Sequence, residues 1–187
     1  MPKTVLVPVA DGTEEIEAVT IIDVLRRAGA EVTVASVGDL QITASRGVKL
    51  VADTQIADCV DKTYDLVVLP GGIPGAEHLR DDENLKQILL RQQSQDRLLG
   101  AICAAPAVVL ETHGLLQGRC ATCHPNFAHK LSDPSNVRAD VVFDQGCATS
   151  RGPGTAMAFS LKLVELLFGK EKMEAVAEPM VIGRCEG

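Results

Sequence analysis

The stretch TVLVPVADGTEEIEAVTIIDVLRRAGAEVTVASV, residues 4–37, decides the fold class through the order of its patterns. An aliphatic run at 4–10 predicts a strand, and the run at 31–37 predicts a second one. Between them, apolar residues recur at three-residue steps, which predicts a helix: Ile16, Val19, Ile22 and Leu25. A strand, a helix and a strand at this spacing form a right-handed unit whose two strands are parallel.

The ends of this first helix carry capping signals. Thr13 stands where an N-cap side chain is favoured, and Gly29 stands where a C-terminal glycine is favoured. The sequence therefore predicts a helix over 14–29.

The same alternation of strands and helices continues along the rest of the chain. We expect strands at 41–45, 48–53, 64–72, 98–103, 140–143 and 147–149, and helices at 82–95, 105–114, 153–168 and 170–177. This order predicts an α/β fold with a mostly parallel sheet. The length of 187 residues suits a single domain spanning 1–187.

Composition narrows the class of protein. The net charge of -7 argues against a nucleic acid as a specific electrostatic partner. No apolar span of 18 residues occurs, so we expect no membrane partner and a cytoplasmic location. In that reducing compartment the six cysteines are expected to be free thiols. Neither a G-x-G-x-x-G nor a P-loop pattern occurs, so no nucleotide cofactor is indicated.

Three predicted loops follow strands at the same edge of the expected sheet. They are Asp11-Gly12-Thr13, Pro70-Gly71-Gly72 and Cys103-Ala104-Ala105. Ligands of open α/β sheets bind outside the carboxyl ends of the strands. We therefore look for the chemistry where these three loops meet.

Cys103 is the strongest candidate nucleophile. It ends a predicted strand and precedes a predicted helix, with small neighbours that allow a sharp turn. A thiol at a helix N-terminus is expected to have a lowered pKa and to form a thiolate near neutral pH. The alternative is an inert buried cysteine, which is common in protein cores.

Backbone and carboxyl groups could support this thiol. Gly71 and Gly72 could aim N–H groups at it and, with the N–H of Ala104, form an oxyanion hole, although two glycines also make an ordinary turn. The helix dipole explains Glu14 and Glu15. Glu17 could face the carboxyl edge, where burial would keep it protonated as a hydrogen-bond donor to a thiolate or as a general acid/base.

The run RCATCHP at 119–125 contains the spelling C-x-x-C-H in Cys120, Cys123 and His124. A haem attachment site would need export, and a zinc site would need further ligands, for which His129 has poor spacing. A thioredoxin-like dithiol would sit at a strand-to-helix turn, whereas Pro125 delays any helix until after the motif. We interpret the spelling as accidental and expect no metal.

The remaining cysteines and His113 have simpler interpretations. Cys59 and Cys147 are expected to be structural, and Cys185 to be a spare exposed thiol in the C-terminal tail. His113 lies near a predicted helix end, where the dipole alone explains it.

Four motifs in this order resemble the ThiJ/PfpI family, in particular its parkinsonism-associated, DJ-type deglycase and chaperone branch. They are DGTEEIEAV (11–19), VVLPGG (67–72), AICAAPA (101–107) and SRGPGTA (150–156). The resemblance implies a flavodoxin-like (class I glutamine amidotransferase-like) α/β/α sandwich and a homodimer. This sequence differs from some members of the family at Ala44, where those members carry a second cysteine.

The resemblance also implies roles for single residues. Cys103 would be a reactive nucleophile that oxidises to a sulfinate, and Glu17 its protonated partner. Gly72 and Ala104 would supply backbone N–H groups, and His124 would be the site histidine. Arg27 and Arg46 would lie near the pocket and the dimer interface.

The activity implied is that of a cofactor-independent cysteine enzyme acting on small carbonyl compounds or glycated substrates. It would be a glyoxalase or a deglycase, of the hydrolase or lyase type. Ala104 after Cys103 argues against a peptidase, because the family's proteases carry the paired histidine there. The alternative is a non-enzymatic redox sensor or holdase that uses the oxidation of Cys103.

Overall fold

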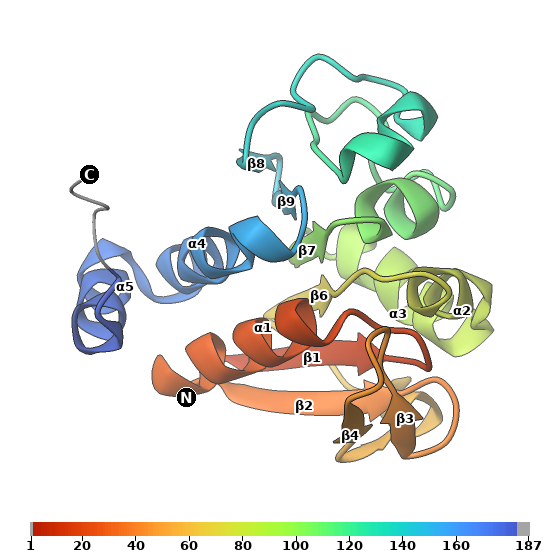
Figure 1. Cartoon of the computed structure of the whole chain (residues 1–187), viewed down its shortest axis with the longest axis horizontal. Helices are drawn as coiled ribbons and strands as arrows, with labels where there is room; N and C mark the ends of the chain where they lie inside the picture. The colour runs from red at the N-terminus through yellow and green to blue at the C-terminus, as the bar shows by residue number, and fades with distance from the viewer. Residues whose placement is uncertain (1, 183–187) are drawn as a thin grey trace.

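The computed structural model describes residues 2–182, so Cys185 lies outside the described residues. Seven strands in this range form one sheet in the order β5-β2-β1-β6-β7-β9-β8, and β3 and β4 form a separate antiparallel pair (Figure 1). All neighbours in the large sheet are parallel except β8 and β9. The predicted α/β fold with a mostly parallel sheet is confirmed.

The elements have the following bounds. The strands are β1 Thr4–Val9, β2 Glu31–Ser36, β3 Gln41–Thr43, β4 Lys49–Val51, β5 Thr54–Gln55, β6 Leu66–Leu69, β7 Leu98–Ile102, β8 Val141–Asp144 and β9 Cys147–Ser150. The helices are α1 Glu15–Arg27, α2 Gly75–Asp81, α3 Glu83–Ser94, α4 Ala156–Phe168 and α5 Lys170–Ala177.

Helices cover both faces of the sheet, which gives the α/β/α sandwich. Helix α1 packs against α4, and α4 packs against α5, on one face (Figure 1). Helices α2 and α3 contact each other on the other face, and α2 contacts the segment that follows β7. The central strand β6 is entirely buried, as its aliphatic sequence LVVL predicts for a strand covered on both sides. No helix within residues 2–182 is long and apolar enough to cross a membrane.

The first strand–helix–strand unit agrees with the sequence except at the N-cap. Strands β1 and β2 pair in parallel from Thr4 opposite Glu31. The side chain of Glu14, not that of Thr13, caps α1 by accepting the N–H of Glu17 at 2.8 Å. Thr13 instead closes the preceding loop, because its Oγ1 accepts the N–H of Ala10 at 2.9 Å.

Two elements on the α2 side differ from the sequence prediction. Helix α2 was not predicted, because its seven residues GAEHLRD carry little apolar periodicity. The predicted helix at 105–114 is a π-helix over Pro106–Leu110 that continues as turns. In this segment the N–H of Glu111 bonds to the carbonyl of Pro106, five residues back, at 2.9 Å.

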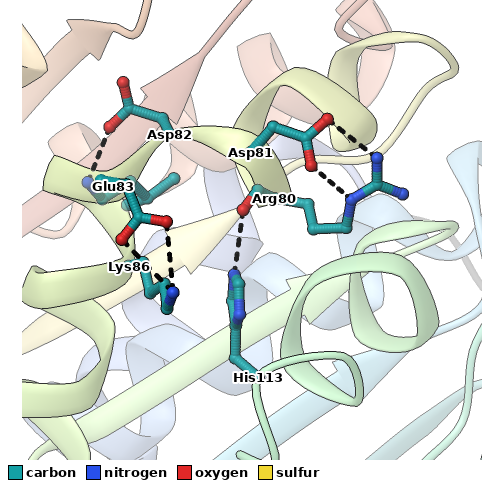
Figure 2. A network of polar contacts seen from close by, with 7 residues as sticks. Arg80, Asp81, Asp82, Glu83, Lys86 and His113 are labelled. Carbon is teal, nitrogen blue, oxygen red and sulfur yellow. Dashed lines mark hydrogen bonds and ion pairs between the residues drawn. The ribbon is translucent and has the colours of Figure 1, made fainter.

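His113 links this segment to α2 (Figure 2). Its Nε2 lies 3.0 Å from the carbonyl oxygen of Arg80, at the end of α2. The guanidinium of Arg80 donates to Asp81 at 2.7 and 2.8 Å. Burial lowers the pKa of His113. Because its ring contacts the carbonyl of Arg80, a tertiary contact explains this histidine rather than the helix dipole alone. The contact joins the segment after Cys103 to the helix that follows Gly71 and Gly72.

Candidate active site

The three loops at the carboxyl edge of the sheet meet as predicted. The N–H of Glu14 donates to the carbonyl of Gly71 at 2.9 Å, which joins the loop after β1 to the loop after β6. A Cβ atom added to Gly71 would lie 2.6 Å from the Cβ of Cys103, so the loops after β6 and β7 are also in close contact. The N–H of Cys103 donates to the carbonyl of Ser150 at 3.0 Å.

Cys103 has the backbone of a nucleophile elbow. Its φ angle is +64°, in the left-handed region that residues other than glycine rarely occupy. It directly follows β7 and is followed by Pro106 at the start of the π-helix. Such local strain persists only where the surrounding structure holds it, as it often does at functional sites. The predicted sharp turn is confirmed, and the residue is only 8% exposed.

Glu17 is buried beside the thiol. Its Oε2 accepts the N–H of Gly71 at 2.7 Å, and its carboxyl group interacts with the Cys103 side chain. Oε1 makes no hydrogen bond of ordinary geometry with the described residues, which leaves it available to the thiol. Burial, with a smaller contribution from the charge of Glu14, raises the pKa of Glu17 to about 7. The predicted burial of this carboxyl group is confirmed.

The pKa of Cys103 differs from the sequence prediction. Burial, followed by the charge of Glu17, raises it to about 12, although the N–H groups of Gly72 and Ala104 act to lower it. The expectation of a thiolate stabilised by a helix N-terminus is wrong, because the sulfur is largely removed from water and its neighbour is a carboxyl group. The thiol therefore needs a base near neutral pH, and Glu17 is the adjacent group with a suitable pKa.

The sequence suggested three backbone N–H donors for the thiol, those of Gly71, Gly72 and Ala104, and the structure uses only two of them in that way. The N–H groups of Gly72 and Ala104 interact with the sulfur of Cys103. The N–H of Gly71 does not serve there, because it is bonded to Glu17. Gly71 contributes in another way, since its missing side chain makes room for Cys103.

His124 lies next to Cys103 through its main chain. Its N–H donates to the carbonyl of Cys103 at 2.8 Å. Its ring Nδ1 accepts the N–H of Asn126 at 3.3 Å, which caps the 3-10 helix Pro125–Lys130. A Cβ atom added to Gly152 would lie 3.5 Å from the Cδ2 atom of the His124 ring. The prediction that the helix starts only after the C-x-x-C-H motif is confirmed.

The two cysteines of C-x-x-C-H do not share one site. The segment 120–124 runs alongside β9, because the N–H of Cys120 donates to Asp144 at 2.8 Å and that of Thr122 to Thr149 at 2.9 Å. Three residues of extended chain separate the two Cα atoms by about 10 Å, beyond the roughly 7 Å that a disulfide spans. Cys120 is exposed and Cys123 is buried. Residues 2–182 contain no group of three or more His, Cys, Asp or Glu side chains that could hold a metal ion.

Glu15 has a structural role that the sequence did not reveal. Its carboxylate accepts the hydroxyl of Ser45 at 2.9 Å and the N–H of Arg46 at 2.8 Å. Although burial acts to raise the pKa of Glu15, these hydrogen bonds lower it overall. The carboxylate therefore fixes the β3–β4 hairpin against the start of α1. A helix dipole explains an acidic residue there, but only the tertiary structure identifies these partners.

Arg27 and Arg46, which the family resemblance puts near the pocket and the dimer interface, lie far from each other in the structure. Arg46 is exposed at the tip of the β3–β4 hairpin, where its N–H bonds to Glu15. Arg27 pairs with Asp23 at 2.7 Å near the far end of α1. Ten helical residues separate Arg27 from Glu17, about 15 Å along the axis. The structure therefore does not bring Arg27 to Cys103.

Gly71→Ala is expected to disrupt the site. The added Cβ would lie 2.6 Å from the Cβ of Cys103, so one of the two loops must move. We expect a loss of about 1–3 kcal/mol in unfolding free energy and a loss of about 100-fold in the reactivity of Cys103 towards substrate. Urea unfolding and steady-state kinetics measure both effects. Gly154→Ala is the matched control, because its Cβ would meet no atom within 4 Å. Equal behaviour of the two variants would show that this contact is unimportant.

Comparison with known proteins finds a family model that covers most of the chain. The family model described as the DJ-1/PfpI family matches residues 3–166. Protein DJ-1 homolog B of Arabidopsis thaliana is 50% identical over 96% of this chain, which spans only 42% of that relative. Protein dj-1beta of Drosophila melanogaster is 41% identical, with 97% of this chain and 98% of the relative covered.

Two further matches bear on activity and structure. A Caenorhabditis elegans protein named glutathione-independent glyoxalase DJR-1.2 is 36% identical, with 96% of each chain covered. The structure of oxidized Toxoplasma gondii DJ-1 superposes with a TM-score of 0.93 at 46% identity, covering 97% of this chain and 100% of the other.

Proposed function

This chain belongs to the DJ-1/PfpI family, and on that premise we propose that it is a cofactor-independent glyoxalase whose nucleophile is Cys103. The observation that carries the proposal is the buried pair of Cys103 and Glu17. Burial raises the pKa of Glu17 to about 7, so its carboxylate is available to accept the thiol proton near neutral pH. The C. elegans relative that is named a glutathione-independent glyoxalase supports the same activity.

The chemistry begins with a proton transfer within the pair. Glu17 takes the proton of Cys103 as the sulfur adds to the aldehyde carbon of methylglyoxal. The resulting alkoxide forms where the N–H groups of Gly72 and Ala104 converge, so these donors stabilise its charge. Protonation of the alkoxide gives a hemithioacetal attached to Cys103.

The second stage is an internal oxidation and reduction. A base moves a proton from C1 to C2 through an enediol, so C1 is oxidised to a thioester carbonyl and C2 is reduced to a secondary alcohol. Glu17 is the adjacent base. We assign His124, whose main chain bonds to the carbonyl of Cys103, as a second proton carrier. Water then hydrolyses the thioester and releases lactate together with the free thiol. No external oxidant or metal is required for this balance.

The small exposure of Cys103 favours small substrates. Only 8% of the residue is accessible, so a two- or three-carbon dicarbonyl fits its approach better than a folded glycated protein. Deglycation is an extension of the same chemistry, because the sulfur could displace an amine from the early adduct of an amino acid or nucleotide. This setting requires a reduced thiol, which is consistent with the proposed cytoplasmic location and with the free cysteines in the described part of the chain.

The second candidate function is a redox-sensing stress protein or holdase. A cysteine held at φ +64° next to backbone N–H groups is a site where an oxidised sulfur would gain hydrogen bonds. The two functions predict different products. A sensor would be oxidised by peroxide at Cys103 without forming lactate from methylglyoxal.

The proposed assembly is a homodimer formed through the exposed face of α1. Ile16 is 56% exposed on this helix, and Val48 is 47% exposed on the hairpin that Glu15 holds beside it. Val19 and Arg27 continue the exposed side of α1 at helical spacing. Such an apolar patch is typical of a protein interface. Light scattering should give twice the mass of one chain, whereas the mass of a single chain would contradict the proposal.

The test of the glyoxalase proposal is the conversion of methylglyoxal to lactate by the purified protein without glutathione. We expect continuous turnover, with lactate exceeding the protein many times over. Absence of lactate, together with peroxide oxidation at Cys103, would favour the sensor instead. The Cys103→Ser variant, purified in the same way, excludes a contaminating glyoxalase, because a contaminant would form lactate equally in both preparations.

A further inference from the structure

The motif SRGPGTA at 150–156 contributes no residue to the proposed reaction, although it contacts the site at two points. It begins at the end of β9 and leads through a 3-10 turn, Pro153–Thr155, into α4. The carbonyl of Ser150 accepts the N–H of Cys103 at 3.0 Å. A Cβ atom added to Gly152 would lie 3.5 Å from the Cδ2 atom of the His124 ring, so this glycine packs beside that ring.

Thr155 closes this loop with its hydroxyl group. It stands at the N-cap of α4, where a threonine side chain usually accepts an N–H of the first turn, but within the described chain it makes no such bond to α4. Its Oγ1 instead accepts the N–H of Gly152 at 3.1 Å, which also closes the 3-10 turn, and lies 2.7 Å from the Oγ of Ser150. The hydroxyl of Ser150 donates in turn to the carbonyl of Asp140 at 2.7 Å.

The number of protons fixes the direction of these bonds. Each hydroxyl group has one proton, and a carbonyl oxygen can only accept. Ser150 is fully buried and gives its proton to Asp140, so the short contact with Thr155 carries the proton of Thr155. The result is one chain of hydrogen bonds that starts at the N–H of Gly152 and ends at the carbonyl of Asp140. Successive hydrogen bonds of this kind strengthen one another.

The elbow at Cys103 depends on the position of Ser150. Its φ angle of +64° is unfavourable for a cysteine and persists only where the surrounding structure holds it. The carbonyl of Ser150 holds the N–H of Cys103, and the hydroxyl of the same serine is bonded on both sides within the chain. The end of β9 therefore cannot shift without breaking a bond to Cys103 or to Thr155.

We propose that Thr155 is a positioning residue for the reaction, because its hydroxyl group fixes the loop that holds the elbow of Cys103. It acts through Ser150, whose carbonyl binds the N–H of Cys103, and through Gly152, which packs beside the ring of His124. The effect on turnover rests on the proposed glyoxalase function. The effect on the backbone of Cys103 can be measured whether or not the protein forms lactate.

Three variants of the full chain test the proposal. Thr155→Val removes the hydroxyl group but keeps a side chain of similar shape, and Thr155→Ser keeps the hydroxyl group. Thr54→Val is the matched control, because Thr54 is also half-buried and donates its hydroxyl to Asp58 at 2.9 Å, but lies in the edge strand β5. Amide hydrogen exchange measured by NMR reports on the backbone, and steady-state kinetics with methylglyoxal report on turnover.

Thr155→Val should affect Cys103 selectively. We expect the amide of Cys103 to exchange about 10-fold faster than in the wild type, since its acceptor is no longer fixed. We expect kcat for lactate formation to fall by about 10–100-fold, with little change in KM, because the nucleophile is misplaced rather than the substrate bound less tightly. Thr155→Ser and Thr54→Val should match the wild type in both measurements.

Other results would overturn the inference. Unchanged exchange at Cys103 in Thr155→Val, or faster exchange there with an unchanged kcat, would show that the hydroxyl group does not position the nucleophile. Equal acceleration at Cys103 and in the central strand β6 would show a general loss of stability. Failure of Thr155→Ser to restore the wild-type values would show that the methyl group matters instead.

The two proposals fail in different ways. A wild-type protein that forms no lactate would refute the glyoxalase proposal, while exchange at Cys103 would still decide whether Thr155 holds the elbow. If Thr155→Val does not fold, Ser150→Ala interrupts the same chain of hydrogen bonds and keeps the carbonyl that binds Cys103. It should show the same selective acceleration at the amide of Cys103, and its absence would overturn the inference.

Discussion

Cys103→Ser is expected to reduce kcat/KM for lactate formation from methylglyoxal by at least about 10³-fold, as loss of a covalent nucleophile does in other enzymes. A hydroxyl group is a far weaker acid than a thiol. Glu17, with a pKa of about 7, can take a proton from the sulfur as it attacks but cannot produce an alkoxide to a useful extent. The backbone at φ +64° does not depend on the sulfur, so the variant should keep its fold.

The matched control for this variant is Cys147→Ser. Cys147 is also buried, but it lies at the start of β9, away from the carboxyl edge of the sheet. The Cys147→Ser variant should have a lower unfolding free energy, but its kcat per folded molecule should stay close to that of the wild type. Lactate formation that is equal in Cys103→Ser and in the wild type would mean that the activity comes from a contaminant or from another residue.

The sequence predicted the framework of the site because periodicity and glycine signals are local. The strand–helix–strand unit at 4–37 and the hairpin at β8 and β9 follow from alternation and turn residues. The elbow at Cys103 follows from a buried strand that ends at small residues. Each of these features depends on residues that are close together in the chain.

The parts that could not be predicted depend on contacts across the chain. The pKa of Cys103 rises because burial and Glu17 outweigh the backbone donors, and no short stretch of sequence contains that balance. Gly71 looked like an oxyanion donor, but its N–H is bonded to Glu17, 54 residues away. Glu15 looked like a residue favoured by the helix dipole, but it binds a hairpin 30 residues further on.

Glu17→Gln is expected to lower kcat by about 10²–10⁴-fold, the usual contribution of a general base. The amide can still accept the N–H of Gly71, so the geometry of the loop is preserved. In the wild type, activity should rise as the pH passes about 7, because Glu17 must be ionised to take the proton of Cys103. The variant should lose this rise. A profile that keeps the same rise near pH 7 would show that another group is the base.

The stability of the same variant separates a charge effect from a steric one. Burial raises the pKa of Glu17 from 4.5 to about 7, so the folded state holds a proton that the unfolded state has released between these values. The contribution of Glu17 to the unfolding free energy of the wild type is therefore constant below pH 4.5. It makes the wild type less stable as the pH rises towards 7, by on the order of 3 kcal/mol in total. Glu17→Gln carries no such charge, so its unfolding free energy relative to the wild type should increase from pH 5 to pH 8. A difference that is constant with pH would mean that Glu17 acts only through its shape, and the proton transfer assigned to it would have to be abandoned.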